Sequence, residues 1–222
     1  MHTYTVEPLY VPSGEETIAA DFYLPKTNIK PAVILMAHGF AGLRQFKLVQ
    51  YAQRFAKAGY AVILFDYRYW GGSTGKPREL VSLSAQLDDW KTIVQYASNC
   101  KLIDSRRIIL WGTSLSGGYA LSLATDLKNI QAVMVQVPYV DGAETAKLYP
   151  LQRYPEALKR SSQDYMGSKM GLVPKTLSVV DQHKLCFLPT SDSYYGYHSI
   201  VNPDYYWSGE VPARVFFNLM RY

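Results

Sequence analysis

Residues 108–118 read Ile-Ile-Leu-Trp-Gly-Thr-Ser-Leu-Ser-Gly-Gly, a short apolar run that meets a cluster of small residues. The run stops at Gly112, Ser114 follows two residues later, and a helical pattern begins behind it. This is the layout of a nucleophile elbow, a tight strand-to-helix turn that lifts a serine hydroxyl above a sheet. The last position of the usual Gly-x-Ser-x-Gly pattern is Ser116, whose side chain is still small. A Gly-x-Ser triplet also occurs by chance, but with a strand before it and a helix after it the stretch predicts that Ser114 is a catalytic nucleophile.

The first 137 residues alternate between strand and helix patterns. Residues 32–37, 61–65, 108–111 and 132–137 are apolar runs of the kind found in strands buried on both faces, and residues 17–24 predict an earlier strand. Such repeated units predict an α/β fold with a mostly parallel sheet and helices on both faces. The helices are expected where apolar residues recur at helical spacing: Leu48, Tyr51, Ala52, Phe55 and Ala58, with Gly59 as the stop, and Leu83, Leu87, Trp90, Val94 and Ala97.

Three of the predicted strands end in residues that can carry chemistry. The ends are His38-Gly39-Phe40, Asp66-Tyr67-Arg68 and Gly112-Thr113-Ser114. In open parallel sheets, ligands bind beyond the carboxyl ends of the strands. These three segments are therefore expected to converge on one edge of the sheet.

The composition changes after residue 137. Residues 138–210 are rich in Tyr, Pro, Ser and Gly and contain no clear buried strand. We interpret them as a cap insertion of short helices and loops over the site. Residues 211–222 regain helical spacing and are interpreted as the start of a helix that returns to the core. The expected organisation is thus a core over 1–137, a cap over 138–210 and this returning segment.

Length and composition narrow the function class. A chain of 222 residues with a net charge of +5 fits one α/β domain, and no basic cluster interleaved with aromatics suggests nucleic acid. Cys100 and Cys186 have neither metal-ligand nor disulfide-framework spacing, and no metal or cofactor is expected. No signal peptide and no apolar stretch of ~18 residues is visible, which favours a cytoplasmic protein that does not bind membranes.

Two nucleotide-binding alternatives receive little support. The first buried strand is followed by His-Gly-Phe and not by the Gly-x-Gly-x-x-Gly of a dinucleotide site. The glycine-rich segment 71–75 lacks the Lys and the following helix of a phosphate-binding loop.

The motifs at the three strand ends resemble those of the α/β-hydrolases, in particular the serine aminopeptidase-like and dienelactone-hydrolase-like branch and its thioesterase relatives. The resemblance covers roughly residues 17–140. It implies that Ser114 attacks an acyl carbonyl. It also implies that the backbone N–H groups of Leu115 and Phe40 form the oxyanion hole. His38 and Asp66 have a structural role in this reading: Asp66 would pair with Arg68 or cap backbone groups.

The rest of a catalytic triad is harder to find. The resemblance implies an acid and then a histidine after two further strands, and neither strand is visible before Tyr222. Residues in the right order occur only within 138–210, where Asp181 or Asp192 could act with His183 or His198; a surface histidine is the commoner explanation. The exposed edge at 132–137 could pair with a second copy in a homodimer.

Two functions therefore stay open. The first is a serine hydrolase that cleaves an ester, thioester or small amide of a small molecule through an acyl-enzyme on Ser114. The second is a truncated or inactive hydrolase-fold protein that acts as a binding module.

Overall fold

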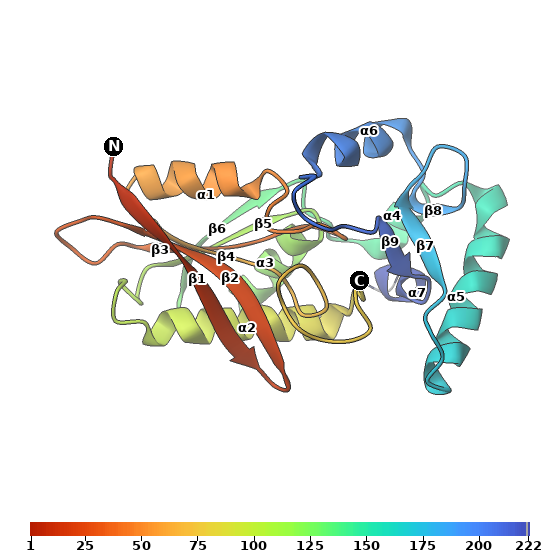
Figure 1. Ribbon diagram of the computed structural model, residues 1–222, viewed down its shortest axis with the longest axis horizontal. Coiled ribbons are helices and arrows are strands. Elements are labelled where there is room, and N and C mark those ends of the chain that lie inside the picture. Colours follow the sequence, from red (N-terminus) through yellow and green to blue (C-terminus); the bar gives the residue numbers. More distant parts are fainter. Residues whose placement is uncertain (221) are drawn as a thin grey trace.

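The apolar runs pair into one six-stranded sheet with the order β1-β2-β4-β3-β5-β6 in the computed structural model, which describes residues 1–220 and 222 (Figure 1). Strands β4, β3, β5 and β6 are parallel to one another. At one side of the sheet β2 is antiparallel to β4, and β1 is antiparallel to β2. The predicted α/β fold with a mostly parallel sheet is confirmed. The bounds are β1 (Tyr4–Ser13), β2 (Glu16–Pro25), β3 (Val33–Ala37), β4 (Ala61–Phe65), β5 (Ile108–Thr113) and β6 (Ile130–Gln136).

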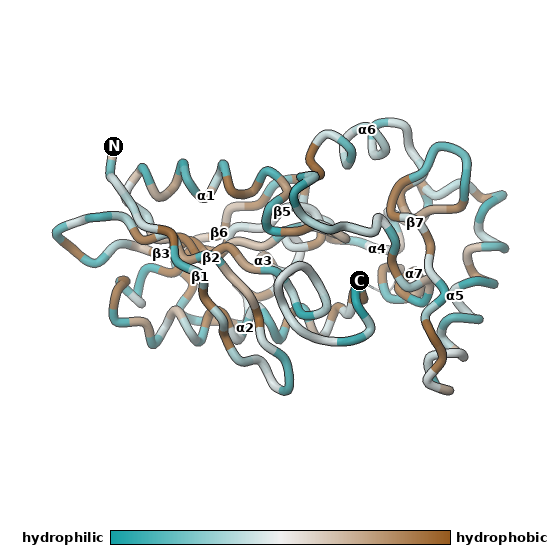
Figure 2. The backbone as a smooth tube through the Cα atoms, viewed as in Figure 1, coloured by the Kyte–Doolittle hydropathy of each residue, from teal (hydrophilic) through white to brown (hydrophobic). Residues whose placement is uncertain are grey.

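Helices cover both faces of this sheet because the side chains of each strand alternate between the faces. Val33 and Leu35 of β3 belong to one core cluster, which includes Trp90 of α2, whereas Ile34 and Met36 belong to a second cluster under α1. In Figure 2 the apolar residues concentrate along these central strands. The covering helices are α1 (Leu48–Lys57), α2 (Leu83–Asn99) and α3 (Leu115–Asp126).

The parallel register brings the three chemistry-bearing strand ends together. Ala37 of β3 lies opposite Phe65 of β4 on one side and opposite Gly112 of β5 on the other. The residues that follow these positions therefore leave the sheet at one edge, as the sequence predicts.

Strand β1 is the element of the sheet that the sequence pattern did not indicate. Most of its residues are exposed, and Pro8 and Pro12 interrupt its pattern. It is held by a continuous antiparallel pairing with β2 from Tyr4 opposite Pro25 to Ser13 opposite Glu16. Pairing in a hairpin with β2 across the turn at Gly14 and Glu15, and not the periodicity of its own residues, determines this strand.

The segment after residue 137 contains helices, as expected, and in addition a small sheet that the sequence did not indicate. Strand β7 pairs in parallel with β8 and antiparallel with β9. Leu177 and Val179 of β7 are almost completely buried. The elements are α4 (Gly142–Ala146), a 3₁₀ turn (Leu151–Arg153), α5 (Tyr154–Lys169), β7 (Thr176–Val180), β8 (Cys186–Leu188), α6 (Ser191–Ile200), β9 (Glu210–Pro212) and α7 (Val215–Leu219).

The expected returning helix over 211–222 differs from the structure at its start. Val211 and Pro212 belong to β9, and only the five residues of α7 are helical; Arg221 lies outside the described residues. Within the described chain, no helix combines the length and the apolar character that crossing a bilayer requires.

Candidate active site

Ser114 lies in a strained turn between β5 and α3. Its backbone angles are φ 52° and ψ −120°, a conformation that non-glycine residues rarely adopt. The turn is possible because its neighbours are small: a Cβ atom added to Gly112 would collide with the carbonyl of Ser116, and one on Gly117 would lie 3.0 Å from Pro138. Such strain persists only where the surrounding structure enforces it, and it clusters at functional sites.

The loop 38–41 passes directly in front of this serine. A Cβ atom on Gly39 would lie 3.0 Å from the Cβ and 3.7 Å from the Oγ of Ser114, so that only glycine permits the approach. The Gly39 carbonyl accepts a hydrogen bond from the N–H of Gly42 at 3.3 Å. The loop is thus a tight turn whose backbone, without a side chain between, faces the serine.

Residues of the cap hold the other side of the same loop. The Tyr197 hydroxyl donates to the Phe40 carbonyl at 2.5 Å, and the Trp207 indole N–H donates to the Ala41 carbonyl at 2.8 Å. The Tyr197 and Trp207 rings stack with an interplanar angle of 15°. These two hydrogen bonds hold the Phe40 and Ala41 carbonyls against the segment 138–210. In the part of the chain that the structure describes, the N–H groups of Phe40 and Leu115 have no intramolecular acceptor.

Ser116 links the elbow to the loop through a buried network. The Trp90 indole N–H donates to the Tyr67 hydroxyl at 2.7 Å, Tyr67 hydrogen-bonds to Ser116, and the Ser116 hydroxyl donates to the His38 carbonyl. Trp90, Tyr67 and Ser116 are each at most 1% exposed. Since an indole can only donate, the network has one direction, from Trp90 to the loop carbonyl.

His38 packs into the core and does not meet Ser114. Its Nδ1 lies 2.9 Å from the Gly39 carbonyl, and its Nε2 lies 3.9 Å from a carboxylate oxygen of Asp66 without a hydrogen-bond partner among the described residues. Burial lowers the pKa of His38 below its usual value of 6.5, although the Asp66 carboxylate acts in the opposite direction. The structural role of His38 is as predicted, and the lowered pKa favours the neutral imidazole.

Asp66 stabilises the turns around it, and its charged partner is Arg44 where Arg68 was expected. It pairs with the Arg44 guanidinium and accepts backbone N–H bonds from Arg44 at 2.8 Å and from Gly72 at 3.1 Å. The capping of backbone groups is as predicted. The pairing with Arg68 is wrong, because the Arg68 guanidinium binds Asp89 at 2.6 Å instead.

The four candidate acid and base residues of the cap form local contacts. Asp181 accepts the N–H groups of His183 at 2.8 Å and Lys184 at 2.7 Å, and these bonds lower its pKa. His198 lies in the last turn of α6 with its Nδ1 2.8 Å from the Tyr194 carbonyl, and Asp192 is in the first turn of the same helix. Among the described residues, no hydrogen bond joins any of them to Ser114.

The sequence did not single out Tyr67, Tyr197 or Trp207. Tyr67 directly follows Asp66 in the motif at the end of β4, and this position was the only sign in the sequence that it could lie near the site. The other two lie in a segment without clear periodicity and reach the loop across 157 and 166 residues of sequence. Within residues 1–220 and 222, no group of three or more His, Cys, Asp or Glu side chains is arranged to bind a metal ion.

Comparison with known proteins places this geometry in context. Residues 29–188 match the model of the family described as serine aminopeptidase S33. The chain is 34% identical over 214 residues to the quorum-quenching protein AidA of Acinetobacter baumannii, a match that covers 95% of this chain and 69% of that protein. It is 33% identical over 128 residues to the thiohydrolase aneE of Aspergillus aculeatus, which covers 58% of this chain and 40% of the thiohydrolase.

The fold is also similar to solved structures. The crystal structure of the α/β hydrolase GrgF from Penicillium superposes with a TM-score of 0.81 at 17% identity, covering 99% of this chain and 73% of that one. The chain thus spans only part of the length of the proteins that it matches.

Proposed function

Because the chain belongs to the serine aminopeptidase S33 family of α/β-hydrolases, we propose that it is a serine hydrolase acting on an ester, thioester or small amide. The observation that carries the proposal is the strained backbone of Ser114, at φ 52°, facing the glycine of the loop 38–41. Such strain costs about 1–3 kcal/mol, and a nucleophile held out of a strand-to-helix turn accounts for it.

In the proposed reaction the Ser114 hydroxyl oxygen attacks the acyl carbonyl carbon and gives up its proton to a base. The negative charge that develops on the carbonyl oxygen is stabilised by the N–H groups of Phe40 and Leu115, which have no other acceptor among the described residues. The alcohol, thiol or amine leaves with a proton, and water then hydrolyses the acyl-enzyme. A thioester substrate has a parallel in the thiohydrolase relative.

A second candidate function is a binding module on the hydrolase scaffold. It is favoured by one observation: in the described part of the chain no imidazole is hydrogen-bonded to the Ser114 hydroxyl. A serine hydroxyl is a weak nucleophile without such a base. The two candidates differ in whether Ser114 reacts.

Hydrolysis of p-nitrophenyl butyrate by the wild type and by Ser114→Ala tests the proposal. Loss of the nucleophile should lower kcat by several orders of magnitude, as in a serine protease where its loss costs about 10⁶-fold. Ser122→Ala is the matched control, because Ser122 is an exposed serine on the same helix. His198→Ala in the same assay tests the cap histidine as the base.

A fluorophosphonate probe separates the two candidate functions. Covalent labelling of the wild type, absent in Ser114→Ala, supports the hydrolase. Equal ester hydrolysis by wild type and Ser114→Ala would contradict the nucleophile assignment, and no labelling together with no turnover would favour the binding module.

A further inference from the structure

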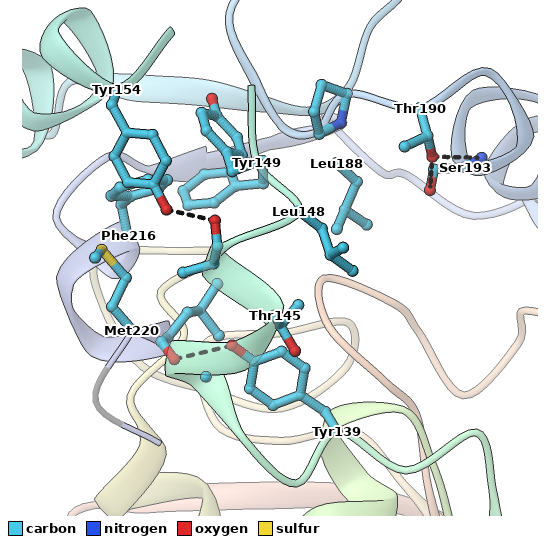
Figure 3. A pocket seen from close by; sticks show the side chains of 15 residues that line it. Tyr139, Thr145, Leu148, Tyr149, Tyr154, Leu188, Thr190, Ser193, Phe216 and Met220 are labelled. Carbon is cyan, nitrogen blue, oxygen red and sulfur yellow. Dashed lines mark hydrogen bonds between the residues drawn. The ribbon is translucent and has the colours of Figure 1, made fainter. Parts of the chain in front are cut away.

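An apolar cavity of about 200 Å³ lies between the segment 138–210 and the residues of α7, beside the turn that follows β6 (Figure 3). Its walls come from segments far apart in the sequence: this turn, α4 and the residues after it, β8 and α7. The lining side chains that matter here are Tyr139, Tyr149, Tyr154, Leu188, Phe216 and Met220.

The tyrosines of this cavity contribute their rings to its wall, while their hydroxyls are already bound. The Tyr139 hydroxyl donates to the Leu219 carbonyl at 2.9 Å, and the Tyr154 hydroxyl donates to the Ala146 carbonyl at 2.5 Å, as drawn in Figure 3. The Tyr149 hydroxyl donates to a carbonyl of β8 at 2.8 Å. Burial raises the pKa of Tyr139 and of Tyr149 to about 12, so that both hydroxyls stay protonated donors.

The other polar side chains around the cavity also take part in hydrogen bonds within the chain. The Thr190 and Ser193 hydroxyls hydrogen-bond to each other at 2.7 Å, and the Thr145 hydroxyl donates to the Asp141 carbonyl at 2.7 Å. Among the described residues that line this space, a ligand therefore meets mainly hydrocarbon and ring faces and no charged side chain. Such a lining favours an apolar group, because a polar one would lose its hydrogen bonds with water.

Two contacts connect the cavity to the candidate active site. The backbone N–H of Tyr139 donates to the Ser114 carbonyl at 2.9 Å. On the other side, the Phe187 ring, which also lines the cavity, packs against the Phe40 ring at 5.2 Å. Two residues that line the cavity, Tyr139 and Phe187, thus contact the nucleophile turn and the loop that faces it.

We propose that this cavity binds the apolar acyl group of the substrate whose carbonyl Ser114 attacks, an inference that rests on the proposed function. A cavity of about 150 Å³ lined by aliphatic and aromatic side chains holds a benzene molecule. The space here therefore suits an aryl group or a straight alkyl chain of roughly six to eight carbons. The substrate class is an ester, thioester or amide of a medium-chain or aromatic acid.

The cavity is tested first by binding, in a Ser114→Ala background in which no acyl transfer occurs. N-methyloctanamide should bind at least tenfold more tightly than N-methylacetamide by calorimetry, since each buried methylene contributes about three- to fourfold. Leu188→Trp fills the cavity and should abolish this difference. Leu172→Trp is the control, because Leu172 is 58% exposed and does not line the cavity. An affinity for N-methyloctanamide that is unchanged by Leu188→Trp would overturn the proposal.

Turnover by the wild type then separates the cavity from the proposed function. We expect kcat/KM for p-nitrophenyl octanoate to exceed that for the acetate at least tenfold. Leu188→Trp should lower this octanoate-to-acetate ratio, whereas the control Leu172→Trp should leave both values unchanged. Specific octanamide binding without any ester hydrolysis would contradict the hydrolase and leave the cavity as an apolar binding site. Ser114-dependent hydrolysis whose chain-length preference is the same in Leu188→Trp would overturn the cavity as the acyl site while the hydrolase stands.

Discussion

Ser116 provides a hydroxyl at the position where nucleophile elbows usually carry glycine. This hydroxyl joins Tyr67 to the carbonyl of His38, in a region from which water is excluded. A glycine there would leave both the Tyr67 hydroxyl and the loop carbonyl short of a partner. An unsatisfied buried polar group costs about 1–3 kcal/mol, so the serine stabilises the elbow and the loop as one unit.

For Ser116→Ala we expect about a tenfold lower kcat for p-nitrophenyl butyrate with little change in KM. The loop that presents the Phe40 N–H loses its tie to the elbow, whereas complete loss of an oxyanion donor costs ~10²–10³. Thermal unfolding should show a loss of about 1–3 kcal/mol. Ser122→Ala again serves as the control. Lower stability with an unchanged kcat would mean that Ser116 supports the fold without positioning the loop.

His38 gives the molecule a pH dependence whose sign follows from its burial. The pKa of His38 is about 6.5 in the unfolded chain and lower in the folded protein. At a pH between the two pKa values, the unfolded chain therefore binds more protons than the folded one. The free energy of unfolding should therefore fall as the pH drops below about 6.5. The Asp66 carboxylate and the Arg44 guanidinium face the ring and act in opposite directions on its pKa.

Chemical denaturation at pH 7 and pH 5 measures this effect. His38→Asn removes the titrating ring and keeps an amide N–H that can donate to the Gly39 carbonyl. Its free energy of unfolding should change less between the two pH values than that of the wild type. The same change in both proteins would exclude His38 as the source.

At the scale of elements, α6 and the segment after it join the cap to the sheet edge. Helix α6 contributes Tyr197 to the Phe40 carbonyl, and Trp207 reaches the next carbonyl of the loop. The loop 38–41 is thus hydrogen-bonded both to Ser116 of α3 and to Tyr197 and Trp207. A movement of α6 would change the position of the Phe40 N–H.

Removing the Tyr197 hydroxyl tests this connection. For Tyr197→Phe we expect kcat for p-nitrophenyl butyrate to fall several-fold, with a loss of about 0.5–1.5 kcal/mol in stability from one hydrogen bond. Tyr195→Phe is the matched control, since Tyr195 lies on the same helix and is 65% exposed. Equal rates in the two variants would show that the loop keeps its position without α6.

At the scale of the whole molecule, β6 is an edge strand of the large sheet and, among the described residues, pairs only with β5. Strand β6 has one hydrogen-bonding side occupied by β5 and reads Ile-Gln-Ala-Val-Met-Val-Gln, without a charged residue. Exposed Val137 and Val140 continue the apolar surface. Edge strands without charge or proline pair readily with another strand, and a second copy offers the same edge in antiparallel orientation.

We therefore expect self-association in sedimentation velocity at tens of micromolar protein. Val135→Lys places a charge on the edge strand and should give a monomer. Val173→Lys is the control at an exposed valine outside the large sheet. A wild-type protein that is monomeric at every concentration would contradict pairing between copies.

Local patterns in the sequence predict the elements that are buried on both faces. Strands β3, β4 and β5 consist of continuous apolar runs, and such runs have few other structures available in a chain of this size. The small residues around Ser114 predict the elbow, because only small side chains permit a strand and a helix to cross so closely. The family and the place of the candidate nucleophile follow from these features.

Tertiary structure alone decides which distant groups complete the site. No pattern in the sequence pairs Asp66 with Arg44 and not with Arg68, joins Tyr197 to the Phe40 carbonyl, or closes an apolar cavity between Tyr139 and Leu188. Strand β1 likewise forms through its hairpin with β2, and β7 through pairing with β8 and with β9, and not through a periodic pattern of their own. Periodicity shows how a single segment is buried. These contacts instead depend on which separate segments meet once the chain has folded, and a pattern within one segment carries no information about its partner.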